Sequence, residues 1–92
     1  MAEIIWDVKA SNSFKKQIDY MRQDSLQTAG KVIDDIFAIL DNLPSNPRRF
    51  PADKFKTQND GNFRAFEKNN IRIAYLISRK NIRILRVRHV KQ

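Results

Sequence analysis

The side chains best suited to chemistry lie in the last third of the chain, where one histidine stands among arginines. His89 is the only histidine of the 92 residues, between Arg88 and Val90. An imidazole with an ordinary pKa of about 6.5 takes up and releases a proton near neutral pH, and nearby cations favour its neutral, basic form. The pattern indicates proton transfer beside an anion. The alternative is a strand-end histidine that hydrogen-bonds to the backbone.

Several cations surround this histidine in the sequence. Arginine is always charged and offers a fork of donors to phosphate oxygens. Arg64, Arg72, Arg86 and Arg88 fall on strands predicted to be adjacent, and they share one sheet face if the register allows it. Lys54 and Lys56 stand on the loop before these strands. We interpret these six side chains as a binding surface for nucleic acid or an acidic protein, with simple solvation as the alternative.

The charge is unevenly divided along the chain, whose formal net charge is +8. Residues 1–46 hold five Lys or Arg against seven Asp or Glu, whereas residues 47–92 hold thirteen against three. An asymmetry of this kind favours an anionic partner for the second half. A generally basic, well-solvated surface is the other interpretation.

Other kinds of chemistry find little support in the composition. The chain has no cysteine, one histidine and two glycines, and its carboxylates do not cluster with ligand spacing. A thiolate or mixed metal site and a glycine-rich phosphate loop are therefore not expected. We expect no metal and no cofactor. No apolar run is long enough to span a membrane, so we expect a cytoplasmic protein with no membrane partner.

The elements that would position these residues follow from the apolar periodicity. A short strand is predicted near residues 4–8, followed by helices over residues 9–23 and 25–43. The second helix ends at Pro44, and a basic loop runs to Gly61. Three strands follow at residues 63–68, 71–77 and 82–90, the first two joined by Asn69-Asn70. Alternation fails at residues 85–89, which indicates a bulge or a strand that is apolar on both faces.

This order predicts an α+β fold of the form β-α-α-β-β-β, in a single domain over residues 1–92. A hairpin of two antiparallel helices should cover one face of a small, mostly antiparallel sheet. The expected core joins residues from both helices and the strands: Leu26, Ile33, Phe37 and Leu40 with Trp6, Ile73 and Tyr75.

The order and spacing of certain segments resemble the RelE/ParE superfamily of bacterial type II toxins. The matching features are Trp6, Asp41-Asn42-Leu43-Pro44, Arg49-Phe50-Pro51, Phe63-Arg64-Ala65-Phe66, Ile71-Arg72-Ile73-Ala74-Tyr75 and residues 82–89. The resemblance implies a small toxin held inactive by a cognate antitoxin protein. RelE-like members cleave mRNA on the ribosome, and ParE-like members poison DNA gyrase.

The resemblance also assigns roles to particular residues. Arg72 stands where RelE-type nucleases place an arginine beside the scissile phosphate. Their two strand lysines would fall near Phe63 and Ala65 and are absent, as is a terminal catalytic tyrosine. Other ribosome-dependent relatives use arginine with a C-terminal histidine, which implies Arg64, Arg72 and His89 as catalytic residues here.

Two hypotheses of function follow. The first is a ribosome-dependent endoribonuclease, an mRNA interferase, with Lys54, Lys56, Arg86 and Arg88 binding nucleic acid or antitoxin. The second is a non-enzymatic inhibitor of DNA gyrase, which rests on the absent lysines and tyrosine. A module whose basic groove only receives an antitoxin is a third interpretation.

Overall fold

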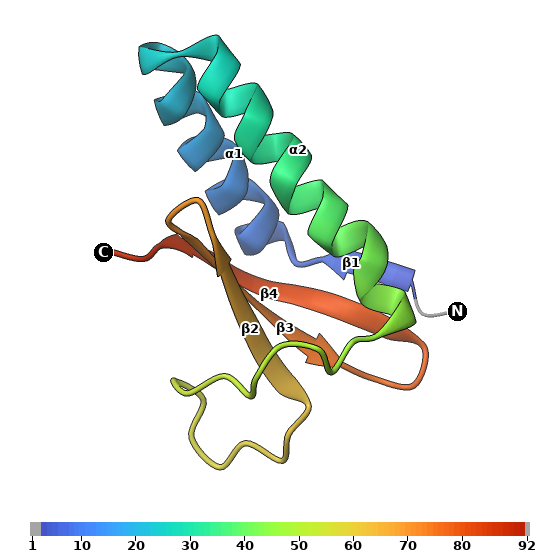
Figure 1. Ribbon diagram of the computed structural model, residues 1–92. Helices are drawn as coiled ribbons and strands as arrows, with labels where there is room; N and C mark the ends of the chain where they lie inside the picture. The colour runs from blue at the N-terminus through green and yellow to red at the C-terminus, as the bar shows by residue number, and fades with distance from the viewer. Residues whose placement is uncertain (1–2, 92) are drawn as a thin grey trace.

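The computed structural model describes residues 3–91, and its elements follow the predicted order (Figure 1). The chain forms β1 (Glu3–Trp6), α1 (Val8–Asp24), α2 (Leu26–Asn42), a 3-10 turn η1 (Leu43–Ser45), β2 (Phe63–Lys68), β3 (Ile71–Ile77) and β4 (Asn81–His89). The expected α+β fold is therefore confirmed. No helix among residues 3–91 is long and apolar enough to cross a membrane.

The four strands form one sheet in the order β1-β4-β3-β2. β1 runs parallel to β4, and the other two pairs are antiparallel. Asn69 and Asn70 join β2 to β3 with φ values of 55° and 66°, the left-handed backbone that a tight hairpin turn requires. The mostly antiparallel sheet and its Asn-Asn turn match the expectation from the sequence.

β4 contains the bulge that was one of the two alternatives. Ala74 pairs with Arg86 and Tyr75 pairs with Ile84, so Leu85 has no partner residue on β3. Leu85 is the extra residue of the bulge, and the side chains before and after it alternate regularly between the two faces of the sheet. Ile82, Ile84, Val87 and His89 consequently share the sheet face of Ile71, Ile73, Tyr75 and Ile77.

The helical hairpin turns within a single residue. The backbone N–H of Ser25 donates to the carbonyl of Met21 at the end of α1, and its side chain accepts from Thr28 N at 3.1 Å at the start of α2. One residue thus ends one helix and caps the next. α1 packs along β4, where Ser13 Oγ donates to the carbonyl of Val87. Pro44 lies in η1, where the helical path tightens and stops.

The core lies between the hairpin and the sheet, and most of the expected members are in it. Leu40 is 2% exposed, and Ile73 and Tyr75 are fully buried. Trp6 and Ile33 are half-buried and pack against this core.

The expectation was wrong for Leu26 and Phe37, which are 76% and 38% exposed. Leu26 begins α2 at the tip of the hairpin, which extends beyond the sheet (Figure 1). The apolar stripe of α2 is wider than the surface that α1 and the sheet present to it.

Candidate functional site

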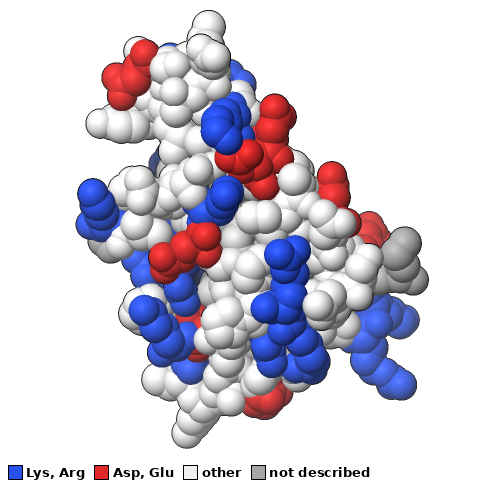
Figure 2. Space-filling view, in the orientation of Figure 1, with Lys and Arg blue, Asp and Glu red and all other residues white. Residues whose placement is uncertain are grey.

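The candidate site is the sheet face opposite the helices, together with the loop that folds onto it. The register places Arg72, Arg86 and Arg88 on this face, because Arg72 pairs with Arg88 and Ala74 with Arg86. We call these three arginines, with Lys54, Phe55 and Lys56 of the loop, the basic face. Figure 2 shows Lys and Arg gathered over the sheet and loop half of the molecule, whereas acidic side chains are more frequent on the helices.

Phe55 is the centre of the basic face. Its ring is 58% exposed and lies near three cationic groups: Arg72 at 4.8 Å, Arg88 at 5.1 Å and Lys54 at 5.2 Å from the ring centroid. Lys56 lies over Phe63 at 4.5 Å. Cations over aromatic rings attract the negative π-face, so these contacts hold the positive charge close to an exposed apolar surface.

Arg72 is the buried member of the basic face, at 9% exposure. Its Nη1 donates to Glu67 Oε2 and its Nη2 to Asp53 Oδ1, each at 2.8 Å. Burial acts to lower the pKa of Arg72, but the two carboxylates outweigh it and raise the pKa above its ordinary value. The guanidinium is thus fixed and compensated by two negative charges, which reduces what it offers to an external phosphate.

Asp53 links the loop to the sheet. Its Oδ1 also accepts from Phe55 N at 3.0 Å, and its own N–H donates to the carbonyl of Phe63 at 2.8 Å. Burial acts to raise the pKa of Asp53, but the bond from Phe55 and the Arg72 guanidinium hold it below its ordinary value. The carboxylate therefore stays ionised and positions Phe55 through the backbone.

Arg64 points into the loop from the other side of the sheet. Arg64 pairs with Tyr75 and therefore lies on the helix-covered face of the sheet. Nε donates to the carbonyl of Gly61 at 2.9 Å, and Nη1 donates to those of Phe50 at 2.7 Å and Arg48 at 3.1 Å. Three backbone acceptors bind Nε and Nη1 of this guanidinium, and these bonds hold the loop in place.

His89 also lies on the helix-covered face of the sheet, since it pairs with Ile71. It lines a cavity of about 460 Å³ together with Lys91 and four residues from the second half of α1: Lys16, Gln17, Tyr20 and Met21. Its Nδ1 accepts from Lys91 N at 3.2 Å. This is the contact that the alternative interpretation of His89 expected, a strand-end histidine bonded to the backbone.

The three residues expected to be catalytic are therefore not brought together. Arg72 lies on the open face, whereas Arg64 and His89 pair with Tyr75 and Ile71 of β3 and so belong to the other face. Four residues expected to bind an anion, Lys54, Lys56, Arg86 and Arg88, do fall with Arg72 around the open face.

Sequence reasoning missed Asp53, Glu67 and Phe55, which organise this face. The sequence did contain a signal for Asp53 and Glu67, because residues 47–92 hold only three Asp or Glu side chains among thirteen Lys or Arg. In the structure, two of these three carboxylates bind Arg72. Among residues 3–91, no three side chains of His, Cys, Asp or Glu gather as metal ligands.

Comparisons with known proteins agree with this architecture. The family described as ParE toxin of type II toxin-antitoxin system, parDE, matches residues 4–92. A structure of the chromosomal ParDE TA system from P. aeruginosa is 20% identical, with a TM-score of 0.74, and covers 98% of this chain and 97% of that one. The YoeB dimer from Staphylococcus aureus is 15% identical, with a TM-score of 0.65 and coverage of 96% and 95%. No curated protein matches this chain.

Proposed function

Because the chain belongs to the ParE toxin family of type II toxin–antitoxin systems, we propose that this toxin stops growth by binding DNA gyrase and not by cleaving RNA. The toxin and its cognate antitoxin follow from the family. The gyrase target and the absence of catalysis are the proposed part.

The observation that carries this proposal is the state of the two arginines. A catalytic guanidinium must aim its donors at charge that develops on the phosphate. Arg72 instead donates to Glu67 and Asp53 at 2.8 Å, and Arg64 donates to three backbone carbonyls. Both groups support the fold of the loop. Binding to a target needs only a surface of suitable shape and charge. It does not require Arg72 and Arg64 to leave their hydrogen-bond partners.

The basic face supplies such a surface. Lys54, Lys56 and Arg86 are exposed, and Phe55 adds an exposed apolar ring among them. We propose that these residues, with Arg88, bind the target or the antitoxin. An acidic antitoxin segment that covered the same face would then keep the toxin from its target.

Ribosome-dependent mRNA cleavage is the second candidate, and the arrangement around Phe55 favours it. An exposed ring flanked by cations can stack a base and hold the adjoining phosphates. Cleavage would use Arg64, Arg72 and His89, and it would need Arg72 to leave its two carboxylates. That rearrangement separates this candidate from the first.

Supercoiling by purified gyrase tests the proposal. Toxin separated from its antitoxin should inhibit the reaction, and added antitoxin should restore it. Arg86→Glu, which reverses an exposed charge on the basic face, should weaken inhibition. Lys9→Glu makes the same change at an exposed site on α1 and should have no effect.

Uninhibited supercoiling at a large excess of active toxin would refute the gyrase target. Cleavage of mRNA on translating ribosomes by the same preparation would establish the second candidate in its place.

A further inference from the structure

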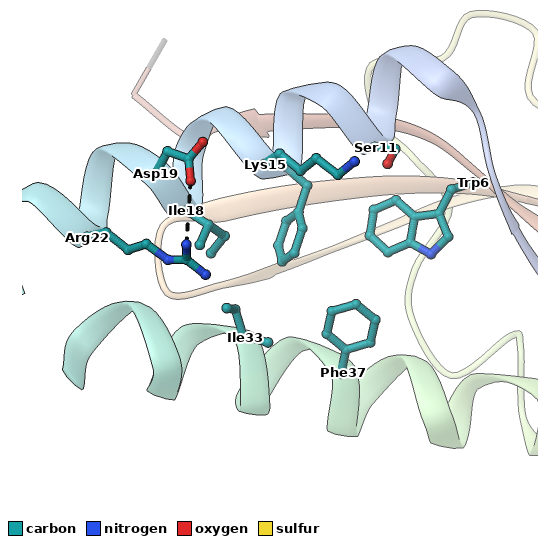
Figure 3. Close-up of a pocket in the computed structure, with 9 residues that line it drawn as sticks. Trp6, Ser11, Lys15, Ile18, Asp19, Arg22, Ile33 and Phe37 are labelled. Atoms are coloured by element: carbon teal, nitrogen blue, oxygen red, sulfur yellow. Dashed lines mark ion pairs between the residues drawn. The ribbon is translucent and has the colours of Figure 1, made fainter. Parts of the chain in front are cut away.

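Two hollows flank α1, on different sides of the helix. The first lies toward α2, and Figure 3 shows Trp6, Ile33 and Phe37 in its apolar wall. The second is the cavity of about 460 Å³ between the second half of α1 and the end of β4. Polar groups predominate among its lining residues, which are Lys16, Gln17, Tyr20, Met21, His89 and Lys91. We consider this second hollow, the α1–β4 cavity, as a ligand site.

The α1–β4 cavity lies where α1 leaves the sheet. Ser13 of α1 still contacts β4 through its hydrogen bond to the carbonyl of Val87. About one turn further along the helix the cavity begins, and the hairpin extends beyond the sheet from there (Figure 1). The bond from Lys91 N to His89 Nδ1 holds the chain after β4 against the same cavity. Its volume falls within the range of about 300–1,000 Å³ that is typical of small-ligand pockets.

Gln17 is the lining residue that the rest of the fold does not explain. Both polar atoms of its side chain, Nε2 and Oε1, are buried, and neither has a hydrogen-bond partner among residues 3–91. Buried polar groups are almost always hydrogen-bonded, because an unpaired one loses its hydration without compensation. A primary amide presents a donor beside an acceptor. The group that satisfies Gln17 therefore offers an acceptor beside a donor, as the edge of a nucleobase does.

Two lysines give the α1–β4 cavity a positive charge. Lys16 lines it from the helix and Lys91 from the chain after β4. Neither lysine forms an ion pair with another of residues 3–91, and the lining residues include no carboxylate. A lysine binds phosphate as a compact charge with three donors. The pair is thus suited to a phosphate group.

Tyr20 and Met21 add apolar surface beside these polar groups. Met21 is half-buried and packs against the core, so it belongs to the inner wall. Tyr20 is 71% exposed although it lines the cavity, so its ring stands at the mouth. Exposed aromatic rings stack on nucleobases with little preference for sequence, because every base has a π-face.

We propose that the α1–β4 cavity binds a nucleotide, with the base edge on Gln17, the base against Tyr20 and the phosphate on Lys16 and Lys91. Simpler ligands match only part of the site. An uncharged carboxamide pairs with Gln17 but brings no charge to the lysines, and inorganic phosphate leaves the buried amide unpaired. A free nucleoside monophosphate and one nucleotide of a single-stranded RNA present the same chemistry. The proposal does not depend on the target of the toxin, since the basic face lies on the other side of the sheet.

Calorimetric titration of the toxin, separated from its antitoxin, with nucleoside 5′-monophosphates tests this site. At least one should bind with a dissociation constant below about 1 mM, and inorganic phosphate should bind at least about tenfold more weakly. Gln17→Met removes the amide but keeps an unbranched side chain, and it should raise the dissociation constant of the nucleotide at least about tenfold. The same variant should keep or increase its Tm, since it removes an unpaired buried polar group.

Matched variants separate this site from the rest of the surface. Lys16→Gln should weaken nucleotide binding at least about threefold, whereas Lys15→Gln, at the neighbouring lysine that lines the first hollow, should not change it. Tyr20→Ala should weaken binding about fivefold or more through lost stacking, and Tyr20→Phe should restore it. Arg86→Glu, on the basic face, should leave the affinity for the nucleotide unchanged.

A short single-stranded RNA distinguishes the two sources of the ligand. An RNA that binds more tightly than its monomers, and loses this affinity in Gln17→Met, identifies a strand as the ligand, whereas equal or weaker binding identifies the free nucleotide. Absence of binding by every mononucleotide and by the RNA would overturn the proposal. Equal affinity for phosphate and nucleotide would also overturn it, because the cavity would then hold an anion only. So would nucleotide binding that Gln17→Met leaves intact and Arg86→Glu removes, which would place the nucleotide on the basic face.

Discussion

Arg72 sits between two carboxylates, and this position makes it a structural residue in the first instance. Removing one partner of a buried ion pair leaves the other charge without compensation. Arg72→Ala should therefore lower the free energy of unfolding by about 3 kcal/mol in urea denaturation. Arg86→Ala removes an exposed arginine from the same face and should change stability by less than about 0.5 kcal/mol. Equal stability of the two variants would contradict the structural role of Arg72.

Tyr75 couples stability to alkaline pH. Its hydroxyl donates to the carbonyl of Pro47 at 2.7 Å. Burial raises its pKa to about 12, although Arg64 and Arg49 act in the opposite direction. The folded state thus binds the proton more tightly than the unfolded chain, whose tyrosine titrates near pH 10. The stabilisation is complete below about pH 10 and is lost as the pH rises through about 12.

The variant Tyr75→Phe isolates the contribution of this phenol to the pH dependence of stability. Between pH 9 and pH 12 the protein should lose about 2 kcal/mol more stability than Tyr75→Phe, which has no proton to release. Tyr20→Phe removes an exposed phenol and should keep the pH dependence of the unmodified protein. Parallel pH profiles for Tyr75→Phe and the unmodified protein would show that burial does not hold this proton.

For single residues, the sequence predicted which side chains are chemically distinctive better than it predicted what those side chains contact. It identified Arg72 and His89 as distinctive, but it could not give the strand register that sends them to opposite faces. It also could not show that Asp53, nineteen residues earlier, would bind Arg72. Such contacts depend on how a loop without periodicity folds back on the sheet.

At the scale of elements, the two ends of α2 should differ in what they contribute to stability. Leu40 is buried and Leu26 is exposed. Leu40→Ala should lower the free energy of unfolding by about 2–5 kcal/mol, through lost burial and the cavity left behind. Leu26→Ala should change it by less than about 0.5 kcal/mol, measured at a concentration where the protein is monomeric. A cost at Leu26 equal to that at Leu40 would contradict the placement of the hairpin tip.

Elements with strong periodicity were predictable, and the exceptions have physical causes. The helices, the three-strand meander and the Asn69-Asn70 turn follow from spacing and turn chemistry. The apolar pattern of α2 could not show which of its apolar residues are buried in the core and which stay exposed, because both groups consist of apolar residues at helical spacing. The loop at 46–62 has no period, and side-chain bonds from Asn59 and Arg64 to the backbone hold it instead.

For the whole molecule, the separation of charge predicts how the antitoxin binds. If an acidic segment covers the basic face, its affinity should fall with added salt as exposed ion pairs are screened. The contacts with Phe55 and Phe63 are apolar and should persist. We expect the complex to survive at about 0.5 M salt with reduced affinity, as measured by calorimetry. Complete loss of binding at that salt concentration would indicate a purely electrostatic contact.

The most direct test of the central claim is whether mRNA is cut while the toxin stops growth. Transcript ends mapped on ribosomes after induction should show no toxin-dependent cleavage. His89→Gln, which removes the only histidine, should stop growth as strongly as the unmodified protein at matched expression. Cleavage within translated codons by the unmodified toxin, lost together with growth arrest in His89→Gln, would contradict the account and establish a nuclease.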